Sequence, residues 1–404
     1  MAEPIAPDGA MRLEVARGLS DVPREAWDRI ANPPGLAFDP FLSWDFLEAL
    51  ERSEAVHPRE GWTPVHLLIR AKGSQSDAST NATGELLAAM PLYAKDHSRG
   101  EYVFDHAWAD AYQRAGGHYY PKLLSAIPFT PVTGRRRLVG PGADAEPLKR
   151  ALLQGAIALC TQNELSGLHV NFPDAAELDA LREIGLLARL DQQFVFTNPG
   201  YRDFSDFLGQ LSSDKRKNLR KERIRAQAGL DIQALTGSQI EAWHWDVFFN
   251  FYQDTGNRKW GSPYLNRQSF ALFHERLREH ILLILAFRGA EPIAGALNFI
   301  GSDALFGRYW GAKEFVPGLH FELCYYQAID FACARGLSRV EAGAQGEHKL
   351  ARGYAPHRVF SAHWISNPQF RRAIGDYLAR EQELVASDMA QLQKFTPFRQ
   401  AEGD

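Results

Sequence analysis

The sequence predicts a mixed α/β protein made of two lobes, each with its own sheet, and a cleft between the lobes. Three observations support this fold class. The chain has 404 residues, more than one ordinary hydrophobic core accommodates. Residues 305–342 read as a strand, a turn, a helix and a second strand, which is the order of a parallel crossover unit. Short matches between the two halves of the chain, always in the same order, indicate that this plan occurs twice.

Composition and charge exclude several classes of protein. Hydrophobic residues make up 45% and charged residues 23% of the chain, which is typical of a folded globular protein. The net charge of −4 provides no overall attraction to nucleic acid or to an anionic membrane. Because no stretch approaches the ~20 apolar residues of a membrane span and the N-terminus lacks a signal-peptide pattern, we expect a cytoplasmic protein. The three cysteines lack metal-ligand spacing, so we expect neither a metal site nor a covalently bound cofactor.

The internal repeat is visible in short motifs. The first copy contains Glu25-Ala26-Trp27, Pro40-Phe41-Leu42, Gly134-Arg135 and Cys160, and the second contains Glu241-Ala242-Trp243, Pro263-Tyr264-Leu265, Gly307-Arg308 and Cys333. Predicted strands at 65–70 and 85–94 correspond to predicted strands at 282–288 and 291–300. We therefore expect an N-terminal lobe over residues 1–200, a basic connecting helix over 201–232 and a C-terminal lobe over 233–404.

The second copy contains the crossover unit in full. A short aromatic strand at 305–310 leads into the turn Val316-Pro317-Gly318. A helix is predicted from 319 to 335, ending before Gly336 as a helix ends before a C′ glycine. A second short strand is predicted at 339–342.

Side chains able to do chemistry cluster after this second strand. Glu341 lies on the strand, and the loop that follows carries Gln345, Glu347, His348, Lys349 and Arg352. The ends of parallel strands and the N-terminus of the crossover helix form a crevice in which ligands bind. We therefore expect the active site in this crevice.

The first copy lacks this cluster and carries instead an aromatic insertion at residues 96–130. Aromatic side chains with a few acidic residues are typical of the wall of a substrate cleft, and equally of a satellite core under a long loop. If the insertion forms a wall, we expect substrate contacts from Asp105, Trp108, Asp110, Tyr112 and Tyr119.

A strongly basic segment lies between the copies, at residues 204–229. Ser212 or Ser213 is a suitable N-cap for a helix that ends at Gly229. The helix reads equally well as a solvated face and as a clamp for a phosphate-bearing donor such as coenzyme A, tRNA or a phospholipid head group. In the second interpretation the donor contacts come from Lys215, Arg216 and Arg220.

Six segments of the sequence resemble a known family: residues 101–112, 119–134, 215–223, 307–311, 319–327 and 343–349. They are similar to the FemAB-like predicted N-acyltransferases of peptidoglycan-biosynthesis/recognition type, which are related to the Fem aminoacyl ligases. The resemblance implies two tandem lobes of the GNAT (acyl-CoA N-acyltransferase) fold. In Fem ligases an aromatic residue and a lysine follow the last strand, beside the reacting carbonyl. Lys349 falls on that lysine and His348 on the aromatic position.

The resemblance implies transfer of an acyl or aminoacyl group to a primary amine, as part of cell-envelope biogenesis. Acyl transfer needs a proton acceptor and donors aimed at the oxyanion. We assign Lys349 to the oxyanion or the donor carbonyl and Glu347 or His348 to the base. Glu322 and His320, near the start of the helix, are alternative acid/base groups. We expect contacts to the donor or acceptor from Arg308, Tyr309, Trp310, Gln345 and Arg352.

Two donors and two other functions stay open. The glycine-rich loop that binds coenzyme A pyrophosphate in ordinary GNAT enzymes is absent, and so is the coiled-coil arm of some tRNA-dependent Fem ligases. The co-substrate is therefore acyl-CoA or another acyl thioester, or else aminoacyl-tRNA held through the basic helix. One alternative function is N-acylation of a long-chain amine or amino lipid, with the aromatic insertion as an apolar slot. The other is a non-catalytic module that binds a cell-wall ligand. The oligomeric state is also open.

Overall fold

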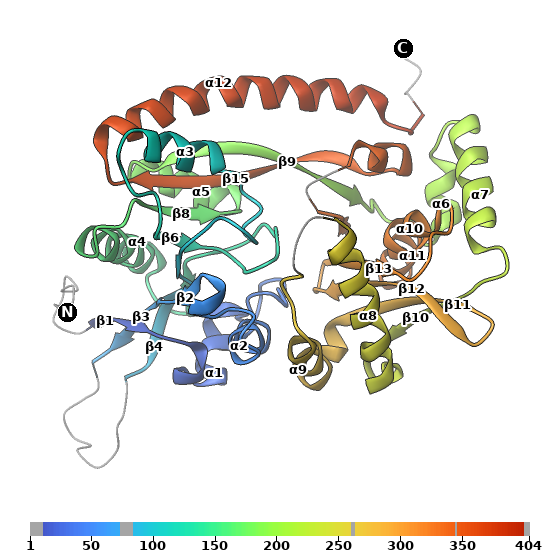
Figure 1. Ribbon diagram of the computed structural model, residues 1–404, viewed down its shortest axis with the longest axis horizontal. Helices are drawn as coiled ribbons and strands as arrows, with labels where there is room; N and C mark the ends of the chain where they lie inside the picture. The colour runs from blue at the N-terminus through green and yellow to red at the C-terminus, as the bar shows by residue number, and fades with distance from the viewer. Residues whose placement is uncertain (1–10, 73–83, 260–262, 344–345, 400–404) are drawn as a thin grey trace. The chain divides into compact units, whose positions relative to one another are not determined.

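The computed structural model describes residues 11–72, 84–259, 263–343 and 346–399 (Figure 1). The chain divides by its internal contacts into two compact units. Unit 1 consists of Met1–Leu36, Phe41–Asp191 and Val359–Leu384, and unit 2 consists of Ala37–Pro40, Gln192–Arg358 and Val385–Asp404. No helix within the described ranges is both long and apolar enough to cross a membrane.

The sheet of unit 2 is antiparallel except at one pair of strands. Its strands follow the order β10 (Asp231–Thr236), β11 (Ile281–Arg288), β12 (Glu291–Ile300), β13 (Ala304–Ala312), β14 (Arg339–Glu341) and β9 (Leu187–Thr197). Only β13 and β14, among these neighbours, pair in parallel. The helices of the unit are α6 (Phe204–Gly209), α7 (Ser213–Gln227), α8 (Ala242–Lys259), α9 (Arg267–Leu277), α10 (Leu319–Phe321) and α11 (Gln327–Arg335).

Strands β11 and β12 are buried on both faces, as their nearly continuous apolar sequences predict. Every residue from 281 to 286 is fully buried. On β12, Gly295 faces Phe248 of α8, whereas its neighbour Ala296 belongs to a core that includes Leu323 of the crossover segment. The sheet therefore lies between α8 and the crossover helix.

Helix α8 approaches β13 so closely that only glycine fits at the point of contact. A Cβ atom on Gly311 would lie 2.3 Å from the backbone carbonyl carbon of Phe251. One turn further along α8, the Thr255 hydroxyl accepts a hydrogen bond from the backbone N–H of Ala312 at 3.3 Å. These contacts explain the Gly in the aromatic strand, where a larger residue would force the helix off the sheet.

The crossover helix begins and ends at glycines in the left-handed region. Gly318 has φ 81° before α10, and Gly336 has φ 65° after α11, as the sequence predicted for the helix end. Between α10 and α11 the chain forms a π-helical turn, Glu322–Tyr326, in place of the continuous α-helix expected over 319–335. Such turns insert one extra residue into a helix and often occur at functional sites.

Unit 1 contains two groups of paired strands. One has the order β1 (Met11–Ala16), β3 (His66–Ala71), β4 (Leu86–Met90) and β7 (Leu138–Val139), and the other has the order β15 (Ala355–Ile365), β8 (Gly167–Asn171), β6 (Lys122–Ser125), β5 (Tyr93–Lys95) and β2 (Trp62–Pro64). The helices are α1 (Arg24–Ala31), α2 (Trp44–Arg52), α3 (His106–Arg114), α4 (Ala145–Gln162), α5 (Ala175–Glu183) and α12 (Pro368–Leu392), the last of which continues into unit 2.

One strand predicted in the first copy is broken. The expected strand at 85–94 is two strands, β4 and β5, which belong to different groups. Pro91 lies between them, and proline cannot donate a hydrogen bond to a neighbouring strand. The matching strand of the second copy, β12, has no such break and spans 291–300 as predicted.

Both units share one basic order of elements, to which unit 1 adds the short strands β2, β5 and β7 and helix α3. A strand, two helices and two antiparallel strands occur as β1–α1–α2–β3–β4 in unit 1 and as β10–α8–α9–β11–β12 in unit 2. A helix then connects two parallel strands, as β6–α4–β8 and as β13–α11–β14. This order is the predicted repeat.

The strand that follows each repeat pairs with the other repeat. β9 follows β8 in the chain, yet its residues 195–197 pair with β14. β15 follows β14, yet its residues 361–365 pair with β8. For this reason 359–384 belong to unit 1, whereas the sequence placed them in the C-terminal lobe, and 192–200 belong to unit 2. The local pattern of a strand does not specify its partner, so this exchange was not visible in the sequence.

Candidate functional site

Strands β13 and β14 form a fork in unit 2. They pair over 304–306 and 339–341, and β13 then continues to Ala312 against β12 alone. Beyond the end of β14 the chain forms a 3₁₀ turn, Glu347–Arg352, which contacts the residues that directly follow β14 through Lys349. A fork at the carboxyl end of parallel strands is a position where α/β proteins bind ligands.

Lys349 lies buried behind the end of β14, with 3% of its surface exposed. Its Nζ donates hydrogen bonds to the carbonyl oxygens of Ala342 at 2.7 Å and Gly343 at 3.1 Å. Burial lowers the pKa of Lys349 to about 8; Cys324 opposes this shift and the Arg308 charge adds to it. A lysine with this pKa changes its protonation state close to neutral pH, which is common for groups at functional sites.

His348, beside Lys349, is exposed and joins an aromatic cluster. Its Nε2 lies 3.0 Å from the Tyr325 hydroxyl, and its ring centroid lies 5.4 Å from that of Phe321 and 6.3 Å from that of His320. Gly346, with φ 113°, makes room for the imidazole, since a Cβ at Gly346 would lie 2.4 Å from His348 Cε1. The π-helical turn brings Tyr325 to His348.

A pocket of about 530 Å³ adjoins this cluster. Eleven residues line it, from α8, the end of β13, the turn after β13 and the start of α10: Thr255, Trp310, Ala312, Glu314, Phe315, Val316, Pro317, Gly318, Leu319, His320 and Phe321. Trp310 and His320, 5.2 Å apart between ring centroids, were both expected at the site. His320 and Phe321 belong to the pocket and also contact His348, so the pocket and His348 lie side by side. The size and apolar lining of the pocket are typical of small-ligand sites.

Glu322 occupies a different position from the other acid/base candidates. It is fully buried, and its carboxylate accepts hydrogen bonds from Arg223 at 3.0 Å, Gln227 at 2.9 Å and Gln327 at 2.8 Å. Three protein side chains therefore occupy this carboxylate, and Glu322 is not among the residues that line the pocket. The geometry therefore favours a structural role for Glu322.

Arg352 contacts two members of the aromatic cluster, His348 and Phe321. Its guanidinium pairs with both carboxylate oxygens of Glu222 and donates to the His348 carbonyl oxygen at 2.6 Å. It also stacks on Phe321, with 3.4 Å from its central carbon to the ring centroid. Arg352 is thus already engaged by protein groups, and it fixes the turn that carries His348.

The remaining residues that the sequence predicted for this site lie on β13 or in the loop after β14. On β13, Arg308 donates to the Gly307 carbonyl oxygen at 2.9 Å, and Tyr309 packs edge-on against Tyr252 at 5.3 Å. Gln345 lies outside the described residues, and of Glu347 only the backbone is described. Within the described part of the chain, His, Cys, Asp and Glu side chains form no group of three that could hold a metal ion.

The aromatic insertion of unit 1 packs inward. Asp105 is buried and accepts hydrogen bonds from the Tyr119 hydroxyl at 2.7 Å and from Lys122, which also donates to Glu101 at 2.8 Å. Burial would raise the pKa of Asp105, but the Lys122 charge, His169 and the hydrogen bonds from Lys122 and Ser98 together outweigh it, so the pKa falls. Burial raises the pKa of Glu101 to about 7 in spite of Lys122.

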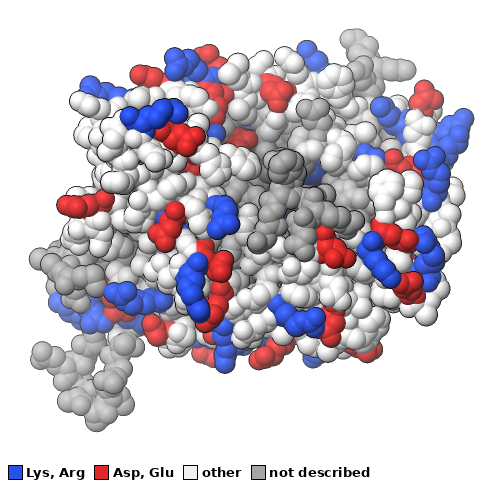
Figure 2. Space-filling view, viewed as in Figure 1, with Lys and Arg blue, Asp and Glu red and all other residues white. Residues whose placement is uncertain are grey.

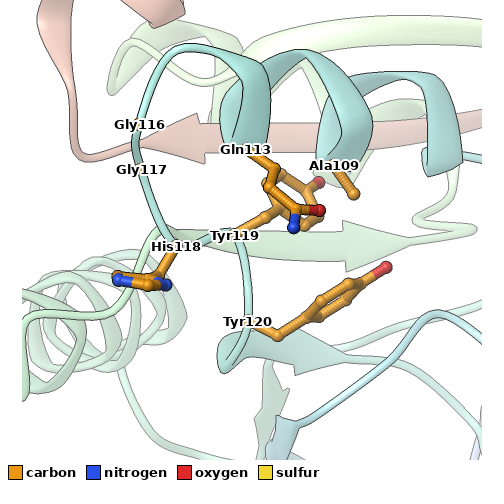
Figure 3. A pocket seen from close by; sticks show the side chains of 7 residues that line it. All are labelled: Ala109, Gln113, Gly116, Gly117, His118, Tyr119 and Tyr120. Atoms are coloured by element: carbon orange, nitrogen blue, oxygen red, sulfur yellow. The ribbon is translucent and has the colours of Figure 1, made fainter.

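The remaining residues of the insertion also lie in or on a small core. Trp108 packs edge-on against His363 at 4.8 Å, and Tyr112 against Phe370 at 4.7 Å, whereas Asp110 is exposed on α3. This packing favours the satellite-core interpretation. Another pocket, of about 330 Å³, is lined by residues of the insertion. Figure 3 shows the side chains of His118 and Tyr120 extending to opposite sides of the backbone that carries them.

Helix α7 confirms the predicted basic helix, with Ser212 at its N-cap and Gly229 just beyond its end at φ 72°. Lys215 and Arg220 are exposed and Arg216 is half-buried. The sequence missed that Glu222 and Arg223 face inward and hold Arg352 and Glu322. The sequence did contain a signal for this, because Glu222 and Arg223 lie at helical spacing from the apolar Leu219 and Ala226, which are buried.

Comparison with known proteins gives one family match, which extends over most of the chain. The model of the FemAB-like family, described as peptidoglycan biosynthesis/recognition, matches residues 18–400. No curated protein matches. The solved structure of FemX has 11% identity and a TM-score of 0.51 and covers 88% of this chain and 98% of its own. At this identity the likeness concerns the fold alone, and it confirms the predicted mixed α/β class.

Two further solved structures resemble the chain more weakly. L-PGS from Bacillus licheniformis has 9% identity and a TM-score of 0.48, covering 91% of this chain and 99% of its own. A tandem GNAT protein from the clavulanic acid biosynthesis pathway has 12% identity and a TM-score of 0.45, covering 89% and 99%.

Proposed function

The chain belongs to the FemAB-like family of peptidoglycan biosynthesis/recognition, and from this premise we propose that it transfers an acyl or aminoacyl group from an activated donor to a primary amine of a cell-envelope precursor. The single observation that carries the proposal is the position of Lys349. A buried ammonium with a lowered pKa just beyond the end of β14 is suited to a carbonyl that becomes an oxyanion.

Lys349 uses two of its three N–H groups on the carbonyl oxygens of Ala342 and Gly343. Among the described residues no acceptor is found for the third, which we assign to the donor carbonyl. The two fixed hydrogen bonds orient the ammonium before the substrate arrives, so little reorganisation is needed when charge develops. Low exposure strengthens the interaction, because water does not screen it.

In the reaction the amine nitrogen attacks the donor carbonyl carbon, and the carbonyl oxygen becomes the oxyanion beside Lys349. A base takes one proton from the attacking amine. The tetrahedral intermediate then collapses, the bond to the leaving group breaks, and the leaving sulfur or oxygen receives a proton. We assign the base to His348, since it adjoins the pocket and its ring is held by the Tyr325 hydroxyl. His320 is the second candidate.

We assign the pocket of about 530 Å³ to the reacting end of the donor. Its wall is apolar apart from Thr255, Glu314 and His320, which suits an acyl or aminoacyl chain better than a pyrophosphate. The donor is an acyl thioester such as acyl-CoA, or an aminoacyl-tRNA. The pocket lining supports a carbonyl-bearing chain of either origin.

A donor-exchange assay tests the proposal. Purified protein is incubated with labelled acyl-CoA or labelled aminoacyl-tRNA and a panel of primary amines, and amide formation is followed by mass spectrometry. Lys349→Met is expected to lower kcat/KM by about 10²–10³-fold, the usual effect of losing one oxyanion donor. Lys313→Met, on an exposed lysine paired with Glu291, is the matched control.

Each outcome discriminates between functions. Unchanged turnover in both Lys349→Met and His348→Gln would overturn the assigned site. Turnover with acyl thioesters and long-chain amines, but not with charged tRNA, would favour N-acylation of an amino lipid. Tight binding of a cell-wall ligand without product from any donor would favour a binding module.

A further inference from the structure

Helix α7 presents two chemically different faces. Its inner face packs on unit 2 through Leu219, Glu222, Arg223 and Ala226. Its outer face is exposed and carries Lys217, Arg220, Lys221, Ile224 and Arg225, with Lys215 near the N-terminal end. Figure 2 shows Lys and Arg side chains gathered at the right-hand edge, where Figure 1 places α7.

Among the residues that the structure describes, none neutralises the charge of this outer face. For Lys215, Lys217, Arg220, Lys221 and Arg225 no ion pair or hydrogen bond is found within the described residues. The acidic Glu222 on the same helix is occupied by Arg352. Five cations on about three helical turns attract a dense array of anions.

Exposed apolar side chains accompany these cations. Ile224 is 72% exposed and lies on the same side of the helix as Lys217, Arg220 and Lys221. Two strongly exposed aromatic residues of unit 2, Phe315 at 87% and Phe395 at 68%, lie in segments that contact opposite ends of α7. Surface apolar residues at this exposure, grouped around one element, indicate an interaction site.

Two contacts join these segments to α7. At the start of α7, the Ser212 backbone N–H donates to the Pro397 carbonyl oxygen at 3.2 Å, two residues from Phe395. Near its end, a Cβ on Gly318 would lie 3.4 Å from the Cβ of Ala226, so the turn after Phe315 packs on the helix. Phe315 also lines the pocket of the candidate site.

We infer that the α7 surface, consisting of Lys215, Lys217, Arg220, Lys221, Ile224 and Arg225 together with Phe315 and Phe395, docks unit 2 onto an anionic lipid bilayer. The cations contact lipid phosphates, and the three apolar side chains enter the boundary between head groups and acyl chains. Because Phe315 belongs to both the surface and the pocket, docking brings the pocket to the bilayer. This last step rests on the proposed function: a pocket that faces the bilayer takes its acceptor amine from a membrane lipid.

The apolar residues favour a bilayer over a nucleic acid. Phosphates of a nucleic acid would also pair with the cations, but Ile224 in the middle of the basic face would then lose contact with water and gain none with a base. Helix α7 itself contains no aromatic residue on which bases could stack. An interfacial helix, in contrast, combines cations with such apolar side chains.

Vesicle cosedimentation tests the inference without any need for turnover. The full chain is mixed with phosphatidylglycerol/phosphatidylcholine vesicles or with pure phosphatidylcholine vesicles at several salt concentrations. Binding is expected with the anionic vesicles, weakening as salt increases, and at least tenfold weaker with the neutral ones. Absence of binding to anionic vesicles at about 0.1 M salt would overturn the inference.

Paired variants identify the surface. Lys217→Gln/Lys221→Gln and Ile224→Ser/Phe395→Ser are each expected to weaken vesicle binding about tenfold, while amide formation with a soluble amine stays unchanged. Leu384→Ser is the control, because Leu384 on α12 is also 72% exposed but lies in unit 1. Loss of tRNA binding in the lysine variant, with vesicle binding unaffected by Ile224→Ser/Phe395→Ser, would assign the surface to nucleic acid and overturn the inference. Vesicle binding without any amide product would instead count against the proposed function.

Discussion

Arg223 turns its guanidinium away from the other cations of α7 and holds Glu322, with Nη2 3.0 Å from the carboxylate Oε1. It stands in a run of basic residues that face solvent, yet only 16% of its side chain is exposed, and Glu322 is fully buried. Gln227 and Gln327 donate to the same carboxylate. This pair fastens α7 to the π-helical turn from which Tyr325 reaches His348.

Glu322→Gln is expected to destabilise unit 2 without removing a catalytic group. Loss of one charge from a buried pair costs roughly 3 kcal/mol, because the Arg223 charge stays buried beside a weaker acceptor. Urea unfolding is the measurement, and Glu275→Gln, on an exposed carboxylate, is the control. A stable variant that has lost all amide formation would instead make Glu322 a catalytic base.

Lys349→Met is expected to keep the fold and to be more stable than the wild type at pH 7, by up to about 3 kcal/mol. Burial lowers the pKa of Lys349 from 10.5 to about 8, so below pH 8 the folded protein pays for a buried charge. As pH rises from 8 to 10.5, the folded state releases this proton before the unfolded state does, and wild-type stability rises toward that of the variant.

Chemical unfolding of wild type and Lys349→Met between pH 7 and 10 measures this difference. The lost hydrogen bonds to Ala342 and Gly343 reduce the advantage of the variant, but they do not change its dependence on pH. A difference in unfolding free energy that is constant from pH 7 to 10 would show that Lys349 has an ordinary pKa.

Local sequence signals predicted the elements that depend on few long-range contacts. Strand β12 is an apolar run closed by turn residues, and Gly336 marks the helix end as expected. Pro91 was present as a signal for the broken strand but was outweighed by the apolar residues around it. The exchange of β9 and β15 left no local signal, because it depends on which repeat each strand pairs with.

The site could be predicted in part. The crossover unit placed His320 and His348 near one another, and the structure brings their ring centroids to 6.3 Å. The burial of Glu322 depends on Arg223, which lies far away in the sequence and reads as one more solvated cation. A charged residue in a charged run shows its partner only in the folded chain, so neither the structural role of Glu322 nor the inward face of α7 was predicted.

Gly346→Ala is expected to impair transfer more than stability. An alanine at φ 113° is strained by about 1–3 kcal/mol, and its Cβ would displace the His348 ring from Tyr325. A fall in kcat of about tenfold is expected, as for a misplaced general base. Gly200→Ala is a matched control, since Gly200 has φ 116° and a Cβ at this position would have no atom within 4 Å. Equal losses of activity in both variants would exclude a specific effect on His348.

The buried pair His169 and His363 in unit 1 should make stability depend on acid pH. Their Nδ1 atoms lie 2.7 Å apart, and the His363 Nε2 lies 2.8 Å from the Ser361 hydroxyl. Burial lowers the pKa of His169 to about 3, and burial also lowers the pKa of His363 well below its usual value. Both rings are therefore neutral in the folded protein, whereas in the unfolded chain they bind protons below about pH 6.5.

The stability that these neutral rings contribute is complete above pH 6.5 and decreases as pH falls toward 3, by at most about 1.4 kcal/mol per pH unit for each ring. Glu101 acts in the opposite direction, because its raised pKa lets the folded state take up a proton first. The readout is therefore the difference between wild type and His169→Gln in calorimetric unfolding at pH 5.0 to 6.5. The wild type should lose stability more steeply than this variant, and His357→Gln, on an exposed histidine, should follow the wild type. If His169→Gln and wild type lose stability in parallel, the two rings are not held neutral by burial.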